Sequence, residues 1–337
     1  MTLILNSPLD MHVHVRQDDM LRFVVPFTSA QFAGAVCMPN TLPPIDTPER
    51  YDRYCEEIRA AAGCPFDPYV PLFFHTGLTQ EMLAPARDRL FGVKLYPAGV
   101  TTNSDAGVSE IAKIEPVLQV LQDLDLPLLV HGETHGYSHD REREFVAVYD
   151  HFARNFPKLR ITMEHISTVE AAEFLDKHDN VFATITLHHL LFTMDDLLGG
   201  PFQPFLFCKP ILKSPRDREA LQSLVIAGHP KVMFGSDSAP HTEVAKRTEG
   251  AAGCFTAPVL LPMLAEFFER HDMLDRLQAF VSDHARRIYG VTPPEKEVRL
   301  IPRTWQVPPR YGSIVPVHAG KTLDWQVEGQ LDFFESR

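Results

Sequence analysis

Three polar side chains alternate with apolar ones near the start of the chain, in the stretch DMHVHVR at residues 10–16. Successive side chains of an extended strand point to opposite faces, so His12, His14 and Arg16 share one face. Imidazole nitrogens bind zinc and similar divalent metals, and the planar guanidinium group binds a carboxylate through two parallel hydrogen bonds. One face of the stretch is therefore apolar, and the other carries side chains that are capable of chemistry.

Other polar residues lie at the carboxyl ends of later apolar runs. They are Asn40, His75, Lys94, His131, His165 and Asp237. Taken singly, a histidine that ends a strand is compatible with a hydrogen-bonded structural role. Several histidines and an aspartate at the same end of different strands instead favour a divalent metal site, because imidazole and carboxylate are the ligands that zinc accepts.

Lys94 lies in the middle of an apolar run, GVKLYP at residues 92–97. Burying an unpaired ammonium group costs several kcal/mol, and this group cannot bind a metal. One interpretation is a lysine paired with an acid. The other is that burial lowers its pKa, and the neutral amine adds CO₂ to form an anionic carbamate that bridges two metals.

Short apolar runs position these residues and recur along the chain. They span residues 9–15, 34–40, 69–75, 91–97, 126–132, 159–165, 181–187 and 231–237. Most are too short for a helix and nearly continuous in hydrophobicity, as buried parallel strands are. Stretches with a helical pattern lie between them at 47–62, 108–124, 167–178 and 214–228. The alternation predicts an α/β fold, a (β/α)8 TIM barrel rather than an open sheet.

The end of the chain has a different composition. Residues 291–313 are rich in proline, and a strand-like stretch follows at 314–327. We expect residues 1–290 to form the barrel and 291–337 to be a short C-terminal extension of the same domain, because fewer than ~50 residues rarely fold alone.

Composition limits the possible partners and compartment. A formal net charge of −12 with no cluster of basic residues argues against nucleic-acid binding, and an anionic substrate would need local positive charge. The sequence has neither a long apolar span nor the features of a signal peptide, which predicts a cytoplasmic protein without membrane association. The five cysteines include no CxxC pair, so free thiols are expected.

A set of motifs extends over nearly the whole chain: DMHVHVR, MPNTLPP, KLYPAGVTTNSDAGV, LLVHGE, EHIST, TITLHHL, KPILK, GSDSAPH and GCFTAP. In this order and spacing the chain resembles the amidohydrolase superfamily, and within it the short-form, homodimeric bacterial dihydroorotases.

The resemblance implies a centre of two zinc ions and an adjacent substrate site. Its metal ligands are His12, His14 and Asp237 for one ion, His131 and His165 for the other, and a carboxylated Lys94 that bridges both. Asp237 is also implied as the catalytic proton carrier. The implied substrate contacts are His14, Arg16, Asn40, Thr101, Thr102, His131, Lys209, His241, Ala252 and Gly253. Lys209 stands where many relatives have leucine, but the family uses backbone groups there. His75, His135, His188 and His189 are assigned structural roles.

The implied reaction is the reversible hydrolysis of the cyclic amide of (S)-dihydroorotate to N-carbamoyl-L-aspartate, a step of pyrimidine biosynthesis. Another cyclic-amide hydrolase, such as a hydantoinase or allantoinase, is an alternative that lacks the carboxylate-binding residues. A structural relative without catalysis is a second alternative, and it would have lost metal ligands. The loop at 96–109 is either a plain connection or, as the resemblance implies, a lid that brings Thr101 and Thr102 to the substrate.

Overall fold

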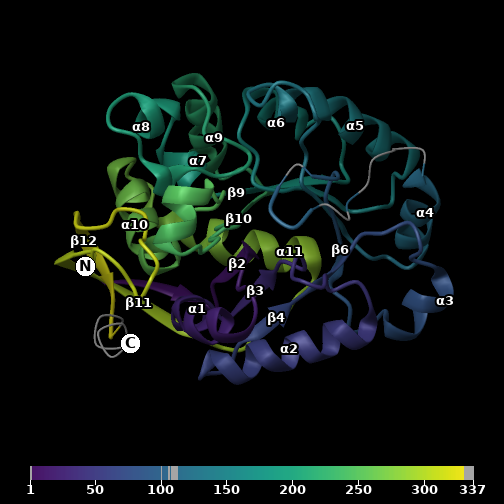
Figure 1. The fold of residues 1–337 in the computed structure, drawn as a ribbon, viewed down its shortest axis with the longest axis horizontal. Coiled ribbons are helices and arrows are strands. Elements are labelled where there is room, and N and C mark those ends of the chain that lie inside the picture. The colour runs from purple at the N-terminus through teal and green to yellow at the C-terminus, as the bar shows by residue number, and fades with distance from the viewer. Residues whose placement is uncertain (1, 100, 105–106, 108–112, 330–337) are drawn as a thin grey trace.

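A closed barrel of parallel strands forms the centre of the computed structural model, which describes residues 2–99, 101–104, 107 and 113–329 (Figure 1). The barrel strands are β2 (Leu9–Val13), β3 (Gly34–Cys37), β4 (Asp67–Tyr69), β5 (Pro71–Phe73), β6 (Gly92–Leu95), β7 (Leu128–Val130), β8 (Ile161–Met163), β9 (Val181–Ile185) and β10 (Val232–Phe234). They pair in the order β2-β3-β4 and β5-β6-β7-β8-β9-β10.

Two features close the barrel. The segments β4 and β5 are separated only by Val70 and together act as one strand, because β4 pairs with β3 and β5 pairs with β6. A parallel bridge between Val13 and Ser238 then joins the end of β2 to the residues that follow β10. The eight apolar runs thus become eight parallel strands around a ring, and the predicted (β/α)8 barrel is confirmed.

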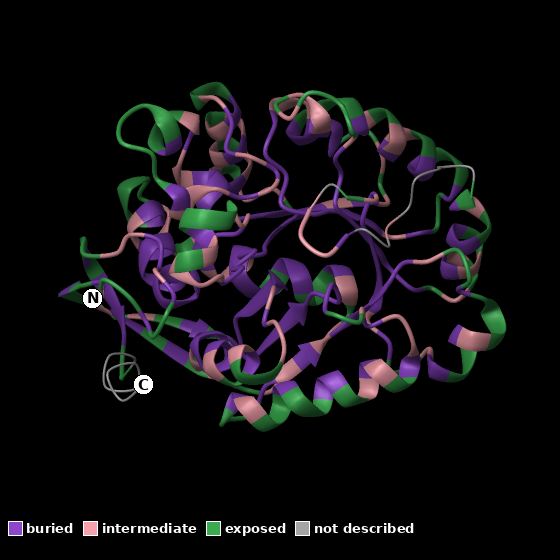
Figure 2. Ribbon diagram, in the orientation of Figure 1, coloured by how far each residue is buried: buried purple, intermediate pink, exposed green. Residues whose placement is uncertain are grey.

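Helices surround these strands. They are α1 (Asp18–Gln31), α2 (Pro48–Ala62), α3 (Gln80–Leu83), α4 (Glu115–Asp123), α5 (Arg141–Asn155), α6 (Val169–Phe174), α7 (Leu187–Leu191), α8 (Met194–Leu198), α9 (Pro215–Ala227), α10 (Leu260–Arg270) and α11 (His284–Tyr289). The strands are buried, whereas the outer faces of the helices are exposed (Figure 2). Because helices cover the barrel from outside, its strands are apolar on both faces.

Local sequence signals set several helix ends. Ser214 caps α9 in a capping box with Asp217, Pro215 occupies the first turn, and Gly228 ends the helix with a φ of 69°. The predicted helix at 167–178 is shorter, since α6 ends at Phe174. Residues 108–112 of the predicted helix at 108–124 lie outside the described part of the chain.

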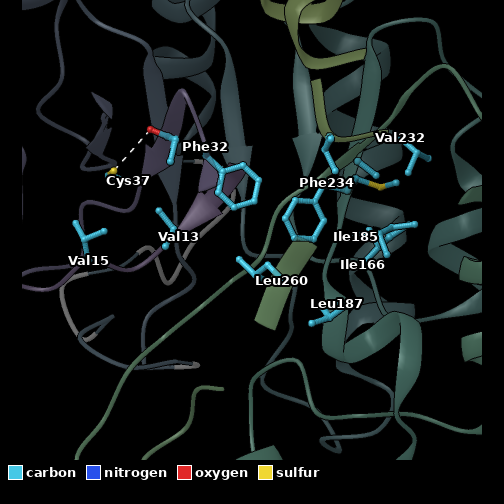
Figure 3. Close-up of a cluster of buried hydrophobic side chains, with 14 of the residues drawn as sticks. Val13, Val15, Phe32, Cys37, Ile166, Ile185, Leu187, Val232, Phe234 and Leu260 are labelled. Carbon is cyan, nitrogen blue, oxygen red and sulfur yellow. Dashed lines mark hydrogen bonds between the residues drawn. The ribbon is translucent and has the colours of Figure 1, made fainter. Parts of the chain in front are cut away.

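The hydrophobic core lies mainly between the strands and their covering helices. Figure 3 shows part of it, in which Val13, Phe32 and Phe234 from neighbouring parts of the ring meet Leu260 of α10. The rings of Phe32 and Phe234 stack with centroids 6.0 Å apart.

The C-terminal extension forms a small sheet with the start of the chain. Strand β1 (Leu3–Asn6) pairs with β11 (Glu297–Gln306), which pairs with β12 (Thr322–Val327), all antiparallel. The sheet lies at the left of Figure 1 beside α10, where the indole nitrogen of Trp325 donates to Glu269 at 2.8 Å. The division of the chain at residue 290 stays a prediction, and residues 330–337 lie outside the described part.

Strand β11 lies inside the proline-rich stretch, for which no strand was predicted. Pro302 is tolerated because β1 pairs only with residues 297–300, which leaves one side of β11 without a neighbouring strand at that point. Within the described residues we find no helix that is long and apolar enough to cross a membrane.

Candidate active site

The carboxyl ends of the barrel strands surround a cavity of about 350 Å³. It is lined by His12, His14, Arg16, Asn40, Tyr96, Thr101, Thr102, His131, His165, Lys209, Asp237, Ala239, Ala252 and Gly253. The structure therefore brings together almost all the predicted site residues. Lys94 and His241 are not among the lining residues, but each contacts one: Lys94 lies against Tyr96, and His241 lies against Arg16 and Ala252.

His12, His14 and Asp237 form one side of the cavity. The Nε2 atom of His14 is 3.1 Å from Oδ1 of Asp237, and that of His12 is 3.5 Å from the same oxygen. One ligand atom of each residue lies within 4.8 Å of the others. Burial lowers the pKa of both histidines, so their imidazoles are neutral and have a lone pair for a metal.

The strand alternation expected from His12 to Arg16 is only partly right. Strand β2 ends at Val13, and Arg16 has a left-handed backbone with a φ of 62°. His165 and Asp237 are also left-handed, with φ values of 41° and 43°. Such conformations are unfavourable for residues with a Cβ and concentrate at functional sites. The backbone bends at each of these positions to direct a side chain into one cavity.

Glu164 fixes the orientation of His12, and the sequence analysis missed it. Its Oε2 lies 2.5 Å from Nδ1 of His12 and accepts a hydrogen bond from Thr184 at 2.8 Å. Burial alone would raise its pKa, but the charges of Lys94 and His12 hold the pKa of Glu164 below its ordinary value. As an ionised acceptor, Glu164 keeps the proton of His12 on Nδ1 and leaves Nε2 free toward Asp237.

His131 and His165 form the opposite side. Nδ1 of His131 lies 3.2 Å from Nε2 of His165. The other ring nitrogen of His131, Nε2, lies 2.8 Å from Oε2 of Glu133. Glu133 also went unnoticed in the sequence, although it follows the ligand in LLVHGE. It supports His131 as Glu164 supports His12, because a carboxylate that holds one ring nitrogen directs the other toward a metal.

Lys94 is fully buried beneath the histidines. Burial lowers its pKa to about 8, against the opposing charges of Glu164 and Asp237. Its ammonium nitrogen has no hydrogen-bond partner and lies 5.2 Å from the centre of the Tyr96 ring. This environment suits the second interpretation of Lys94, the carbamate, because a lowered pKa increases the fraction of neutral amine that can add CO₂.

These donors fit a divalent metal centre. The buried atoms His12 Nε2, His165 Nδ1 and Lys94 Nζ have no hydrogen-bond partner among the described residues. Leaving such an atom unsatisfied costs about 1–3 kcal/mol, so their presence at one cavity needs an explanation. A metal ion would provide a partner for the imidazole nitrogens, whereas Lys94 would first have to become a carbamate, whose oxygens can bind a metal.

The other end of the cavity has the chemistry of an anion site. Arg16 donates through Nε to the carbonyl oxygen of Pro240 at 3.1 Å, and its Nη2 lies 3.0 Å from Nε2 of His241. The same His241 nitrogen lies 3.0 Å from the carbonyl oxygen of Ala252. Burial, with a contribution from Arg16, lowers the pKa of His241 to about 3, so its ring is neutral. If that nitrogen donates to Ala252, the Nη2 group of Arg16 remains available for an anion.

The described part of the 96–109 loop lies against this end. Asn40 donates to the carbonyl oxygen of Thr102 at 2.9 Å, and Asn103 donates to that of Asn40 at 3.1 Å. Thr101 and Thr102 line the cavity. Residues 100, 105–106 and 108–109 of the predicted lid lie outside the described residues, and its movement stays a prediction.

A second group of potential ligands, His188, His189 and Cys208, lies apart from the cavity lining. The Nε2 atom of His189 and the thiol of Cys208 lie 3.0 and 3.1 Å from the carbonyl oxygen of Pro210, and Nδ1 of His189 lies 2.9 Å from the Thr186 hydroxyl. Hydrogen bonds account for His189 and Cys208, whereas both ring nitrogens of the buried His188 have no hydrogen-bond partner among the described residues. We assign no metal to this group.

Comparison with known proteins places this geometry in a family. A family model described as amidohydrolase matches residues 9–291. Dihydroorotases of Helicobacter hepaticus and Helicobacter pylori are 40% and 42% identical to the chain, with 97% of this chain and 98% and 99% of theirs covered. The chain is an amidohydrolase of the dihydroorotase family.

Solved structures agree with this membership. The crystal structure of a dihydroorotase from Campylobacter jejuni has a TM-score of 0.93 at 44% identity and covers 97% of both chains. A dihydroorotase from Saccharomyces cerevisiae in complex with 5-fluoroorotic acid has a TM-score of 0.91 at 32% identity, with 97% of this chain and 98% of that chain covered. An Arthrobacter aurescens L-hydantoinase shares the fold, with a TM-score of 0.79 at 17% identity and coverage of 97% of this chain and 84% of that one.

Proposed function

We propose that this dihydroorotase family member hydrolyses the cyclic amide of (S)-dihydroorotate to N-carbamoyl-L-aspartate, reversibly. The observation that carries the proposal is one cavity that joins a set of metal ligands to an anion site centred on Arg16. Dihydroorotate has both of the matching groups, since it is a cyclic amide with a ring carboxylate. The full-length likeness to dihydroorotases supports the assignment.

The metal centre is proposed to contain two zinc ions. His12, His14 and Asp237 would hold one ion, His131 and His165 the other, and Lys94 would bridge them as a carbamate. Bound there, the ions would supply a water nucleophile at neutral pH and polarise the scissile carbonyl group. Lys94 suits the bridge because its amine is buried and without a partner.

Asp237 is proposed to carry the proton. Burial raises the pKa of its carboxyl group, although His12 opposes the shift. A carboxyl group that is protonated and deprotonated within the reaction cycle takes a proton from the attacking water and delivers it to the departing amide nitrogen. Oδ1 is held 3.1 Å from His14 Nε2, which places the proton carrier among the metal ligands.

Arg16 is proposed to bind the ring carboxylate. Its side chain is anchored through Nε to Pro240, and Nη2 faces the cavity beside the neutral His241. Asn40 and the loop residues Thr101 and Thr102 complete this end and exclude water, which strengthens the attraction between the two charges. Because one edge of the guanidinium group is anchored to the backbone, its other edge would be available to the substrate carboxylate.

The direction of the reaction depends on pH. N-carbamoyl-aspartate has two carboxylates and dihydroorotate has one, so ring closure consumes a proton and is favoured as the pH falls. Hydrolysis is favoured as the pH rises.

Kinetics of two variants would test this division of roles. The zinc-loaded wild-type protein is expected to hydrolyse dihydroorotate in preference to hydantoin, which has no carboxylate for Arg16. Asp237→Ala should chiefly lower kcat, because proton transfer contributes about 10²–10⁴-fold. Arg16→Lys should chiefly raise KM through loss of the planar fork. Equal turnover of the two substrates by the wild type would favour the hydantoinase alternative.

We also propose a homodimer in the cytoplasm that binds neither nucleic acid nor membrane. The dimer and compartment rest on the family likeness, and the described cysteines are all free thiols, as a reducing compartment maintains them. The net charge of −12 disfavours nucleic acid. Sedimentation of the purified protein would test the dimer.

A further inference from the structure

A second buried lysine, Lys246, lies behind the anion end of the cavity. It belongs to a short π-helical turn, Ala245–Glu249, that follows His241, and only 5% of it is exposed. A lysine ammonium group has three donors and no acceptor, so its burial is tolerated only when nearby oxygens satisfy those donors. Its contacts show which part of the chain it serves.

Three backbone carbonyl groups satisfy this ammonium. Lys246 Nζ donates to the carbonyl oxygens of Phe207 at 2.8 Å, Ala251 at 2.9 Å and Gly253 at 2.8 Å. Two of these residues belong to the segment 250–254, and the third belongs to the loop that precedes Lys209. The backbone N–H of Gly253 donates to the Phe207 oxygen as well, at 2.8 Å. Lys246 thus ties together two loops that both line the cavity.

The residue between the two bound carbonyls is Ala252, which lines the cavity. In an extended segment successive carbonyl groups point to opposite sides, so holding those of Ala251 and Gly253 toward Lys246 turns that of Ala252 the other way. There it lies 3.0 Å from His241 Nε2, the nitrogen that also lies 3.0 Å from Arg16. The contacts form a chain from Lys246 through Ala252 and His241 to the anion-binding guanidinium group.

The segment cannot easily adjust by itself. Gly253 has a φ of 146°, and a Cβ there would lie 2.6 Å from the carbonyl oxygen of Ala239. The next residue is fixed too, since its carbonyl oxygen accepts from the backbone N–H of Ala239 at 2.7 Å. The backbone is packed tightly on the cavity side, and Lys246 holds it from behind.

We propose that Lys246 is a positioning residue that sets the affinity of the cavity for the substrate carboxylate by fixing Ala252, and through it His241 and Arg16. The inference rests on the proposed function. Among the described residues, the ammonium group of Lys246 donates to these three carbonyl groups and to no predicted metal ligand or lid residue, so its effect falls on substrate affinity and leaves the metal centre unchanged.

The test is Lys246→Met, which keeps the length of the side chain and removes its three donors. We expect KM for dihydroorotate to rise at least ten-fold, kcat to change less than three-fold, and zinc content to equal that of the wild type. The Kd for 5-fluoroorotate, measured by calorimetry on the zinc-loaded protein, should rise by the same factor as KM.

Lys231→Met is the matched control. Lys231 also donates to two carbonyl oxygens, those of Leu175 at 3.0 Å and His178 at 2.8 Å, but it precedes β10 at the opposite end of the barrel. This variant should lower Tm and leave KM, kcat and the 5-fluoroorotate Kd unchanged.

Several results would overturn the role of Lys246. They are an unchanged KM in Lys246→Met, a loss confined to kcat or zinc content, or an equal rise of KM in the Lys231→Met control. If Lys246→Met does not fold, Lys246→Arg replaces it: the guanidinium cannot meet all three carbonyls from one point, so KM should still rise, and an unchanged KM refutes the proposal. A wild-type protein without dihydroorotate turnover would instead refute the proposed function, whatever the variants do.

Discussion

Replacing Glu164 by glutamine tests whether the carboxylate behind His12 prepares the metal centre. Glu164 Oε2 lies 2.5 Å from His12 Nδ1 at a site without solvent exposure. A carboxylate only accepts, which keeps the proton on Nδ1. Glutamine can present its NH₂ group to Nδ1, and the proton of the ring would then move to Nε2, the nitrogen needed by the metal.

The size of the effect follows from the kind of bond that is lost. A hydrogen bond to a charged group contributes about 1.5–3 kcal/mol, and 1.4 kcal/mol is ten-fold in an equilibrium constant. The affinity for zinc is therefore expected to fall by about 10–100-fold, the range typical of partners that hold a ligating histidine. Activity at limiting zinc should fall in parallel and recover partly at high zinc.

The assay is a zinc titration of the metal-free protein against a competing chelator. Glu115→Gln is the matched control, because Glu115 holds His151 at 2.7 Å in the same kind of pair on the exposed surface. It should leave zinc affinity unchanged. Wild-type affinity in Glu164→Gln, or an equal loss in Glu115→Gln, would refute the reasoning.

Three further outcomes are expected. Lys94→Ala should lose zinc and activity together, with partial recovery in short carboxylic acids that replace the bridging anion; two retained zinc ions with near-normal turnover would contradict the carbamate. Thr101→Ala combined with Thr102→Ala should lower kcat/KM at unchanged zinc content. If the 96–109 loop is a lid, bound ligand should slow its proteolysis in the wild-type protein; an equal rate of cleavage with and without ligand would make it a plain connection. Burial raises the pKa of Glu142 from 4.5 to about 7, so its contribution to stability is present below pH 4.5 and lost as the pH rises through 7. Relative to Glu142→Gln, the wild-type free energy of unfolding should therefore fall by about 3 kcal/mol across this window in urea titrations, and a constant difference would contradict the assignment.

The sequence predicted the barrel because its strands are short and nearly continuous in hydrophobicity and alternate with stretches of helical pattern. Strand β6 (Gly92–Leu95) illustrates this, since Lys94 is the only charged residue in it and the structure buries it completely. The same reasoning missed α10 (Leu260–Arg270), whose residues LLPMLAEFF are apolar around most of the helix. The first six residues of α10 are all apolar and buried, and its polar residues Glu266, Glu269 and Arg270 come only in the second half.

The proposed metal ligands could be named from the sequence, whereas the residues that support them could not. Glu164 and His165 are neighbours, and strand alternation would direct them to opposite faces. The structure brings both to the site because β8 ends at Met163 and His165 has a left-handed backbone with a φ of 41°. Lys246 could not be predicted for another reason. Its partners are backbone carbonyl oxygens, which every residue type has, so the sequence does not show which residues will accept from it.

The distribution of charge across the cavity orients the substrate. Carboxylates of Asp237, Glu164 and Glu133 surround the metal ligands, while Arg16 and Lys246 stand at the other end. In a protein with a net charge of −12, these cations offset the repulsion of an anion only locally. In the proposed function, a ring with one carboxylate would therefore enter with that group toward Arg16, which would turn its amide toward Asp237 and the histidines. Reversing the ring would bring its carboxylate against buried acids, where like charges in a medium of low polarity repel strongly. The same asymmetry that gives affinity thus selects which bond of the ring is hydrolysed.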